Sequence, residues 1–337
     1  MADDATVPTA TASPATSSGP AAGTTPQGRP AAGRPAGGRR AADSTLRKRL
    51  EIAFFVTPAL AMLAVFVVWP ILTAVQMSAY RWNGRGPMED FVGIGNYVSV
   101  LTDDVFLDSL LNNLFIVAAS IAIQLPLGLA IALLLNRKMW GQGALRTIIF
   151  VPYVLAEVVA GVIWFQLLQP QYGLLDTLIS AVGLEPPAQG WLGDVDLALW
   201  TVMGILTWKF IGLAVILFLA GLQGVPEELY EAAQLDGASW WQVQRKITIP
   251  LLGPTIRTWA FLSMIGSLQL FDMVWILTKG GPANATSTMA IFLVNEGTRS
   301  NNFGIAGAAS VVLFVIALVM AVLYQRLFLS RDAKGVA

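Results

Sequence analysis

Neither cysteine nor histidine occurs among the 337 residues of this chain. Without them the chain can form no disulfide, offers no thiol nucleophile and lacks the usual ligands of zinc. Histidine general bases are excluded for the same reason. We therefore expect no metal site and no catalysis that depends on cysteine or histidine.

Charged residues are also scarce. They make up 12% of the chain, against about 25% in a typical soluble domain, while hydrophobic residues make up 55%. Lysine and arginine together balance aspartate and glutamate, so the formal net charge is zero. This composition predicts a membrane protein, and the zero net charge gives no indication of a nucleic-acid partner.

Long apolar runs, by contrast, recur along the chain. A run of about 18 residues or more is long enough to cross the hydrocarbon core of a bilayer as a helix. We therefore predict an all-α integral membrane protein with six transmembrane helices. The predicted spans lie near 52–79, 113–135, 146–169, 197–222, 254–277 and 305–328. Prolines within or at the ends of these spans predict bent helices; they are Pro58, Pro70, Pro126 and Pro152.

The distribution of basic residues predicts the orientation of these spans. Lysine and arginine are concentrated before the first span and after the last span. They are also concentrated in the loop between the second and third spans (the second–third loop) and in the loop between the fourth and fifth spans (the fourth–fifth loop). They are Arg47, Lys48, Arg49, Arg137, Lys138, Arg146, Arg245, Lys246, Arg257, Arg326, Arg331 and Lys334. Because cytoplasmic loops carry the excess of basic residues, we predict that both termini are cytoplasmic.

The N-terminal segment differs from the rest in composition. It is rich in alanine, proline, glycine, serine and threonine and shows no apolar periodicity, which predicts disorder. It lacks the apolar run and cleavage site of a signal peptide. We predict a disordered cytoplasmic tail over 1–49, a membrane domain over 50–330 and a short cytoplasmic tail over 331–337.

The fourth–fifth loop has strong local signals for two short helices. Pro226 followed by two glutamates favours a helix start, and Gly237 favours a left-handed helix end. The stretch from Ser239 to Gln242 matches a capping box, and Pro250 precedes the fifth span. We predict a cytoplasmic helix–turn–helix that presents Ala232 and Ala233 as a patch of small residues.

The same loop carries a family resemblance. Its sequence Glu231-Ala232-Ala233, followed by Gly237 and then Ile249-Pro250-Leu251, resembles the EAA loop of bacterial binding-protein-dependent ABC importers. Three further segments, 91–97, 220–226 and 277–282, resemble segments of their carbohydrate permeases, of the maltose and glycerol-phosphate type. The resemblance covers roughly residues 50–330. An ordinary amphipathic connector is the alternative interpretation of the loop.

The resemblance implies a role for this loop and a set of partners. The loop would insert into a cleft of an ATPase subunit and transmit its closure. The residues implied in coupling are Glu231, Ala232, Ala233, Asp236, Gly237, Ile249 and Pro250. The implied partners are a second permease subunit in a heterodimer, two ATPase subunits, an extracellular solute-binding protein and a sugar. The implied location is the bacterial cytoplasmic membrane.

The chain has no nucleotide-binding motif of its own. No Gly-x-x-x-x-Gly-Lys-Ser/Thr segment occurs in the sequence. We therefore expect a non-catalytic subunit without a cofactor, and we expect ATP to bind to the partner ATPase subunits.

Three ionisable residues fall within the predicted spans: Glu157, Lys209 and Asp272. Such groups are costly in a membrane and usually face a cavity or one another. Glu157 and Lys209 lie at similar depth, so they form either a buried pair or part of a substrate path. Asp272 lies beside Phe271 and Trp275, a combination of carboxylate and rings that suits a sugar.

The candidate translocation path therefore includes Glu157, Lys209, Gln269, Phe271 and Asp272. Weaker candidates are Trp164, Gln166 and Trp208. Three functions remain open at this point: an ABC importer permease, an ion-coupled secondary transporter and an intramembrane enzyme. The resemblance favours the first, with oligosaccharide as the expected substrate and glycerol phosphate or a polyol as alternatives.

Overall fold

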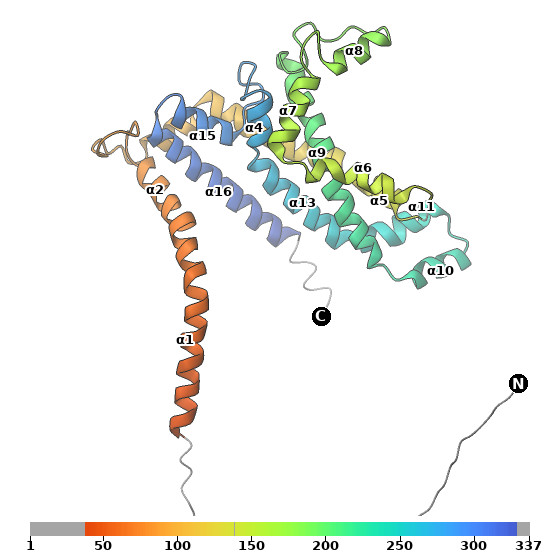
Figure 1. Cartoon of the computed structure of the whole chain (residues 1–337), viewed down its shortest axis with the longest axis horizontal. Helices are drawn as coiled ribbons and strands as arrows, with labels where there is room; N and C mark the ends of the chain where they lie inside the picture. The colour runs from red at the N-terminus through yellow and green to blue at the C-terminus, as the bar shows by residue number, and fades with distance from the viewer. Residues whose placement is uncertain (1–37, 138, 329–337) are drawn as a thin grey trace, which may run out of the picture. The chain divides into compact units, whose positions relative to one another are not determined.

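The computed structural model describes residues 38–137 and 139–328, and every regular element within these ranges is helical (Figure 1). The chain divides into two units, 1–62 and 63–337, so that helix α1 (Gly38–Leu63) belongs almost wholly to the first unit. The predicted tails lie outside the described residues over 1–37 and over 331–337.

Helix α1 begins at Gly38, within the segment for which the sequence predicted disorder. The residues before the apolar run include alanine, arginine, leucine and lysine, which favour helix. Because extending an existing helix is far less costly than nucleating one, the apolar helix continues toward the N-terminus.

Four of the six predicted spans are continuous apolar helices. They run over Glu51–Ser78, Asp104–Leu135, Val195–Gln223 and Phe303–Leu327. The first of these consists of the end of α1, a π-helical segment η1 (Ala64–Val68) and α2 (Trp69–Ser78). The second consists of α4 (Asp104–Ala119), η2 (Ser120–Gln124) and α5 (Leu125–Leu135). The other two are α9 (Val195–Gln223) and α16 (Phe303–Leu327).

The two remaining predicted spans are broken. The third consists of α6 (Gln142–Val154) and α7 (Glu157–Leu167), which meet at an angle of 100°. The fifth consists of α13 (Gly253–Leu268) and a short α14 (Asp272–Leu277), separated by three residues. The bend that Pro152 predicted for the third span is therefore confirmed, whereas the interruption of the fifth span was not predicted.

Shorter helices join these elements. They are α3 (Gly95–Leu101), α8 (Leu174–Ala181), α10 (Glu227–Leu235), α11 (Trp240–Val243), η3 (Gln244–Thr248), α12 (Ile249–Leu251) and α15 (Met289–Thr298).

Each of the three π-helical segments ends two residues before a proline, namely Pro70, Pro126 and Pro250. A proline lacks a backbone N–H, and its ring clashes with the carbonyl four residues earlier. A wider turn relieves that clash without ending the helix. The bending predicted from Pro70 and Pro126 therefore takes the form of a local widening.

Helix α9 is central to the packing of the second unit, where it contacts α5, α6, α13 and α14. Small residues allow the closest contacts. A Cβ atom at Gly212 would lie 2.8 Å from the carbonyl oxygen of Ile149 on α6. A Cβ atom at Gly161 on α7 would lie 2.9 Å from the Ile276 side chain on α14. Small interface residues of this kind are typical of helices packed in membranes.

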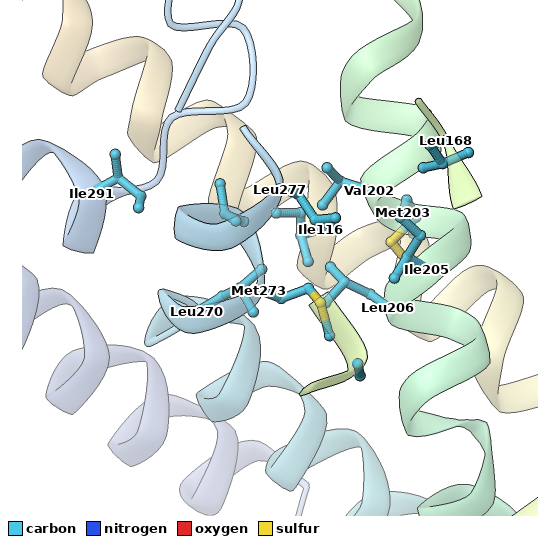
Figure 2. Close-up of a cluster of buried hydrophobic side chains, with 13 residues drawn as sticks. Ile116, Leu168, Val202, Met203, Ile205, Leu206, Leu270, Met273, Leu277 and Ile291 are labelled. Carbon is cyan, nitrogen blue, oxygen red and sulfur yellow. The ribbon is translucent and has the colours of Figure 1, made fainter. Parts of the chain in front are cut away.

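A buried apolar cluster connects the broken helices to α9 and α4. It includes Ile116, Met203, Leu206, Leu270 and Met273, which converge in Figure 2. The cluster packs α7 and α14, the segments that follow the two breaks, against α9 and α4.

The segment that follows the first span caps the end of α2. The Asn96 side-chain amide donates to the backbone carbonyls of Ser78, at 2.9 Å, and Tyr80, at 2.8 Å. The Tyr97 hydroxyl lies 2.6 Å from the Ser78 hydroxyl. The segment 91–97 therefore satisfies carbonyls that the helix end leaves without partners.

The break between α13 and α14 is stabilised by side chains from other elements. Asn113, which is fully buried on α4, donates to the Ser267 carbonyl at 2.7 Å and accepts from the Met289 N–H at 2.9 Å. The Thr288 hydroxyl donates to the Leu270 carbonyl at 2.9 Å. These bonds replace the helical ones that the break removes.

We predict that Asn113→Ala destabilises the protein by roughly 2–4 kcal/mol, because it leaves a buried carbonyl and a buried N–H without partners. Asn136→Ala, at an exposed helix end, is the matched control and should change stability by less than about 1 kcal/mol. Thermal unfolding of the two variants in detergent measures the difference. Equal midpoints would contradict the role assigned to Asn113.

Candidate functional site

The two broken helices meet in the second unit, where α7 packs against α14. Each of these segments begins with an acidic residue, Glu157 on α7 and Asp272 on α14. A carboxylate at this position is favoured because the N-terminus of a helix carries a partial positive charge. The two carboxylates are also near enough to interact electrostatically.

Lys209 stabilises the break between α6 and α7. Its Nζ donates to the carbonyl oxygens of Pro152 and Tyr153, both at 2.9 Å, and of Leu155, at 2.5 Å. The side chain is only 2% exposed. The three hydrogens of the ammonium group are thus used on three carbonyls at the C-terminal end of α6, where a cation is also favoured by the helix dipole.

A cavity of about 330 Å³ lies between these breaks. Its walls come from η2, α6, α7, α9, α13 and the segment 269–272. Its lining residues are Ile116, Ser120, Gln124, Tyr153, Glu157, Leu206, Phe210, Leu213, Trp259, Leu262, Ser263, Gly266, Ser267, Gln269, Leu270, Phe271 and Asp272.

Most of the predicted path residues line this cavity. The structure brings Glu157, Gln269, Phe271 and Asp272 to it from two predicted spans. Lys209 is not a lining residue. Nor are the weaker candidates Trp164, Gln166 and Trp208: the rings of Trp164 and Trp208 pack edge to face, with centroids 5.4 Å apart, beside the apolar cluster.

The buried ion pair considered for Glu157 and Lys209 does not form. An ion pair does join Arg81 to Asp90, at 3.5 Å, between two exposed side chains. The ammonium of Lys209 is instead directed to backbone carbonyls, because the break in α6–α7 leaves three of them to satisfy.

A cluster of three polar side chains in the cavity wall was not predicted from the sequence. Ser120 Oγ lies 2.5 Å from Ser263 Oγ and donates to Gln124 Oε1 at 3.1 Å. All three residues line the cavity. Each of these polar residues stands within an apolar run of the sequence, and this is the signal that could have identified them. Two of them, Ser120 and Gln124, lie in the π-helical segment that precedes Pro126.

The cavity offers groups that suit a polyhydroxylated solute. Carboxylate, amide and hydroxyl oxygens can accept hydrogen bonds from hydroxyl groups. The Phe271 ring stacks on Trp275 with centroids 5.3 Å apart, which fixes an aromatic face beside Asp272. Pockets that bind small ligands combine apolar walls with a few polar groups in this way.

The loop after α9 forms the helix–turn–helix that its sequence predicted. Helix α10 ends in a Schellman motif: Gly237 N–H donates to the Gln234 carbonyl at 3.0 Å, and Ala238 N–H donates to the Ala233 carbonyl at 2.9 Å. Gly237 has φ of 71°, and Ser239 and Gln242 form both bonds of a capping box.

The surface of this loop differs from the predicted patch of small residues. Ala232 is exposed, but Ala233 is buried. The exposed apolar side chains of the loop are instead Leu235, Trp240 and Trp241, and Leu235 is 90% exposed. Of the other residues implied in coupling, Glu231, Asp236 and Pro250 are also exposed, whereas Ile249 is half-buried.

We predict that Lys209→Met destabilises the protein by roughly 3–5 kcal/mol, because three carbonyls lose their common partner. Glu157→Gln should cost far less, and the double variant should show an interaction energy below about 1 kcal/mol, since the two side chains form no ion pair. Lys246→Met, at an exposed lysine, is the control. Detergent unfolding of all four variants tests this, and an interaction energy near 3 kcal/mol would instead indicate direct pairing.

Known proteins resemble the chain over most of its length. It is 36% identical to the lactose transport system permease protein LacF of Rhizobium radiobacter over 83% of this chain and 94% of that protein. It is 32% identical to the trehalose/maltose transport system permease protein MalF of Thermococcus litoralis over 80% of this chain and 91% of that protein.

The fold also has a solved counterpart. It matches a chain of a bacterial alginate ABC transporter, solved in complex with an alginate pentasaccharide-bound periplasmic protein, with a TM-score of 0.74. That match has 22% sequence identity and covers 84% of this chain and 95% of the other. A family model for the inner membrane component of binding-protein-dependent transport systems matches residues 124–331, and the chain belongs to this family of multi-pass membrane permeases.

Proposed function

We propose that this chain is the permease subunit of an ATP-driven importer that moves a carbohydrate across the cytoplasmic membrane after delivery by an extracellular binding protein. The observation that carries the proposal is the family match, which includes the fourth–fifth loop and every cavity-lining residue except Ile116 and Ser120. The chain itself contributes the passage rather than a catalytic centre, since its sequence has no phosphate-binding loop.

The proposed substrate is a sugar, with oligosaccharides as the first choice. Relatives named as lactose and trehalose/maltose permeases support this class. The cavity supports it as well, because carboxylate, amide and hydroxyl groups lie beside aromatic rings there. Its volume of about 330 Å³ is near the lower end of the range for small-ligand pockets. A second permease subunit would enlarge it.

We propose six membrane crossings with both termini in the cytoplasm. The bent pair α6–α7 and the interrupted pair α13–α14 each count as one crossing in this scheme. The excess of lysine and arginine in alternate loops supports the orientation. In the same scheme residues 1–49 and 331–337 are cytoplasmic tails, and residues 50–330 form the membrane domain.

We propose that the loop from α10 to α12 couples the permease to a partner ATPase. Helix α10 presents Glu231 and Leu235 outward, and the capping box presents Trp240 and Trp241. Exposed aromatic and aliphatic side chains beside a carboxylate are typical of a protein contact. The Tyr230 hydroxyl lies 3.3 Å from the Thr248 hydroxyl, which links α10 to the π-helical segment that leads toward α13.

The Gly237 backbone gives a direct test of this loop. A Cβ atom there would meet nothing within 4 Å, so a substitution acts through its positive φ alone. Gly237→Val should reduce uptake and substrate-stimulated ATP hydrolysis together by roughly fivefold or more, because a β-branched residue is strained at positive φ. Gly237→Asn, which tolerates this φ, should remain close to wild type.

Assays of co-purification with the ATPase and of uptake in vesicles distinguish the two variants. Glu231→Ala should weaken ATPase association without affecting membrane insertion. If Gly237→Val retained both normal association and normal uptake, the coupling role of the loop would be disproved.

Purification of the intact complex tests the proposed subunit composition. We expect this chain together with one different permease subunit and two ATPase subunits, with transport restored in vesicles only when the binding protein and ATP are added. The segment 91–97, which resembles one member of such permease pairs, motivates this prediction. A transport-competent assembly with this chain as its only permease would exclude the heterodimer.

A further inference from the structure

The charged residues that line the cavity are all acidic. Among its lining residues two are acidic, Glu157 and Asp272, and none is lysine or arginine. Asp272 is exposed, while Glu157 is half-buried. Both carboxylates sit at the beginning of a broken-helix segment, so their positions are fixed by the backbone.

The nearby cations do not line the cavity. Lys209 interacts electrostatically with Glu157, but its ammonium hydrogens are directed to three backbone carbonyls and its side chain is almost fully buried. Arg299 lies over the Trp275 ring, with its guanidinium carbon 5.5 Å from the ring centroid, and is not a lining residue.

A buried amide on the opposite wall points to a hydroxyl-bearing solute. Gln124 lines the cavity and is only 4% exposed. Its Oε1 accepts from Ser120, whereas its NH₂ group donates to no acceptor within the described part of the chain. A solute hydroxyl oxygen can accept from this group, and solute hydroxyl hydrogens can be donated to the two carboxylates across the cavity.

We propose that this cavity admits uncharged polyhydroxylated solutes and discriminates against those that carry a carboxylate or a phosphate. The inference rests on the proposed function and narrows its substrate class, disfavouring glycerol phosphate. The physical cause is repulsion between like charges, which is strongest where water is partly excluded. A solute carboxylate placed beside Asp272 has no lysine or arginine among the lining residues to offset it.

The absence of cysteine from the chain provides a direct binding assay. In the assembled complex, Ser263→Cys places one thiol on the cavity wall, and the rate at which a maleimide labels this subunit reports occupancy of the cavity. The neutral probes are maltose and lactose, and the acidic probes are maltobionate and lactobionate. The binding protein is omitted, so that its own selectivity does not contribute.

We expect the neutral probes to slow labelling at concentrations roughly tenfold lower than the acidic probes. Asp272→Asn should reduce this preference several-fold by improving protection by the acidic probes, and Glu157→Gln should act in the same direction. Asp108→Asn removes the same charge from an exposed site on α4 outside the cavity and should leave the preference unchanged.

The outcomes separate this inference from the proposed function. Protection by neutral probes, with a preference that Asp272→Asn and Glu157→Gln leave unaltered, would overturn the charge discrimination and leave the carbohydrate permease intact. Equal protection of the thiol by neutral and acidic probes in the Ser263→Cys protein without a further substitution would also overturn the charge discrimination and leave the carbohydrate permease intact. If no sugar protected the thiol and the complete system also failed to take up sugar, the proposed function would fail, and the inference with it.

Discussion

The three hydrogen bonds from the Lys209 ammonium to the backbone of α6 make the break in the third predicted span possible. A broken helix leaves carbonyls without intrahelical partners, and a membrane interior has little water to replace them. A single lysine satisfies three such carbonyls and matches the negative end of the helix dipole. Asn113 and Thr288 perform the same task at the break in the fifth span.

The hydrogen bonds that stabilise the two helix breaks determine the position of the cavity. Once both helices are interrupted, the new helix starts at Glu157 and Asp272 line the same cavity as the hydroxyl and amide groups of η2. The acidic residues would be costly within continuous helices facing lipid, and they become acceptable at a partly solvated cavity. The same backbone breaks therefore provide both the cavity and several of the polar groups that line it.

The loop after α9 differs from the two breaks, because its conformation is determined by residues within the loop itself. A proline, a left-handed glycine and a capping box fix two short helices without help from distant residues. Its exposed surface combines the apolar side chains of Leu235, Trp240 and Trp241 with charged residues such as Glu231. Along the chain, η3, α12 and α13 follow one another between this loop and the cavity-lining residues Ser263 and Ser267.

The sequence by itself determined the membrane class, four continuous spans and the helix–turn–helix of residues 226–243. Long apolar runs and short-range caps are local signals, and local signals suffice for such elements. It also identified Glu157, Gln269, Phe271 and Asp272 as path candidates, because polar residues are rare in apolar runs.

Only the tertiary structure decided that the bend expected near Pro152 is a full break and that the fifth span breaks as well. It also decided that Lys209 binds carbonyls rather than Glu157, and that Gln124 and Ser263 complete the cavity. No glycine or proline occupies the break at Leu155 and Ala156. The helix can be interrupted there because Lys209, which is 54 residues from Leu155 along the chain, satisfies the freed carbonyls. That contact cannot be predicted from the spacing of residues in the sequence.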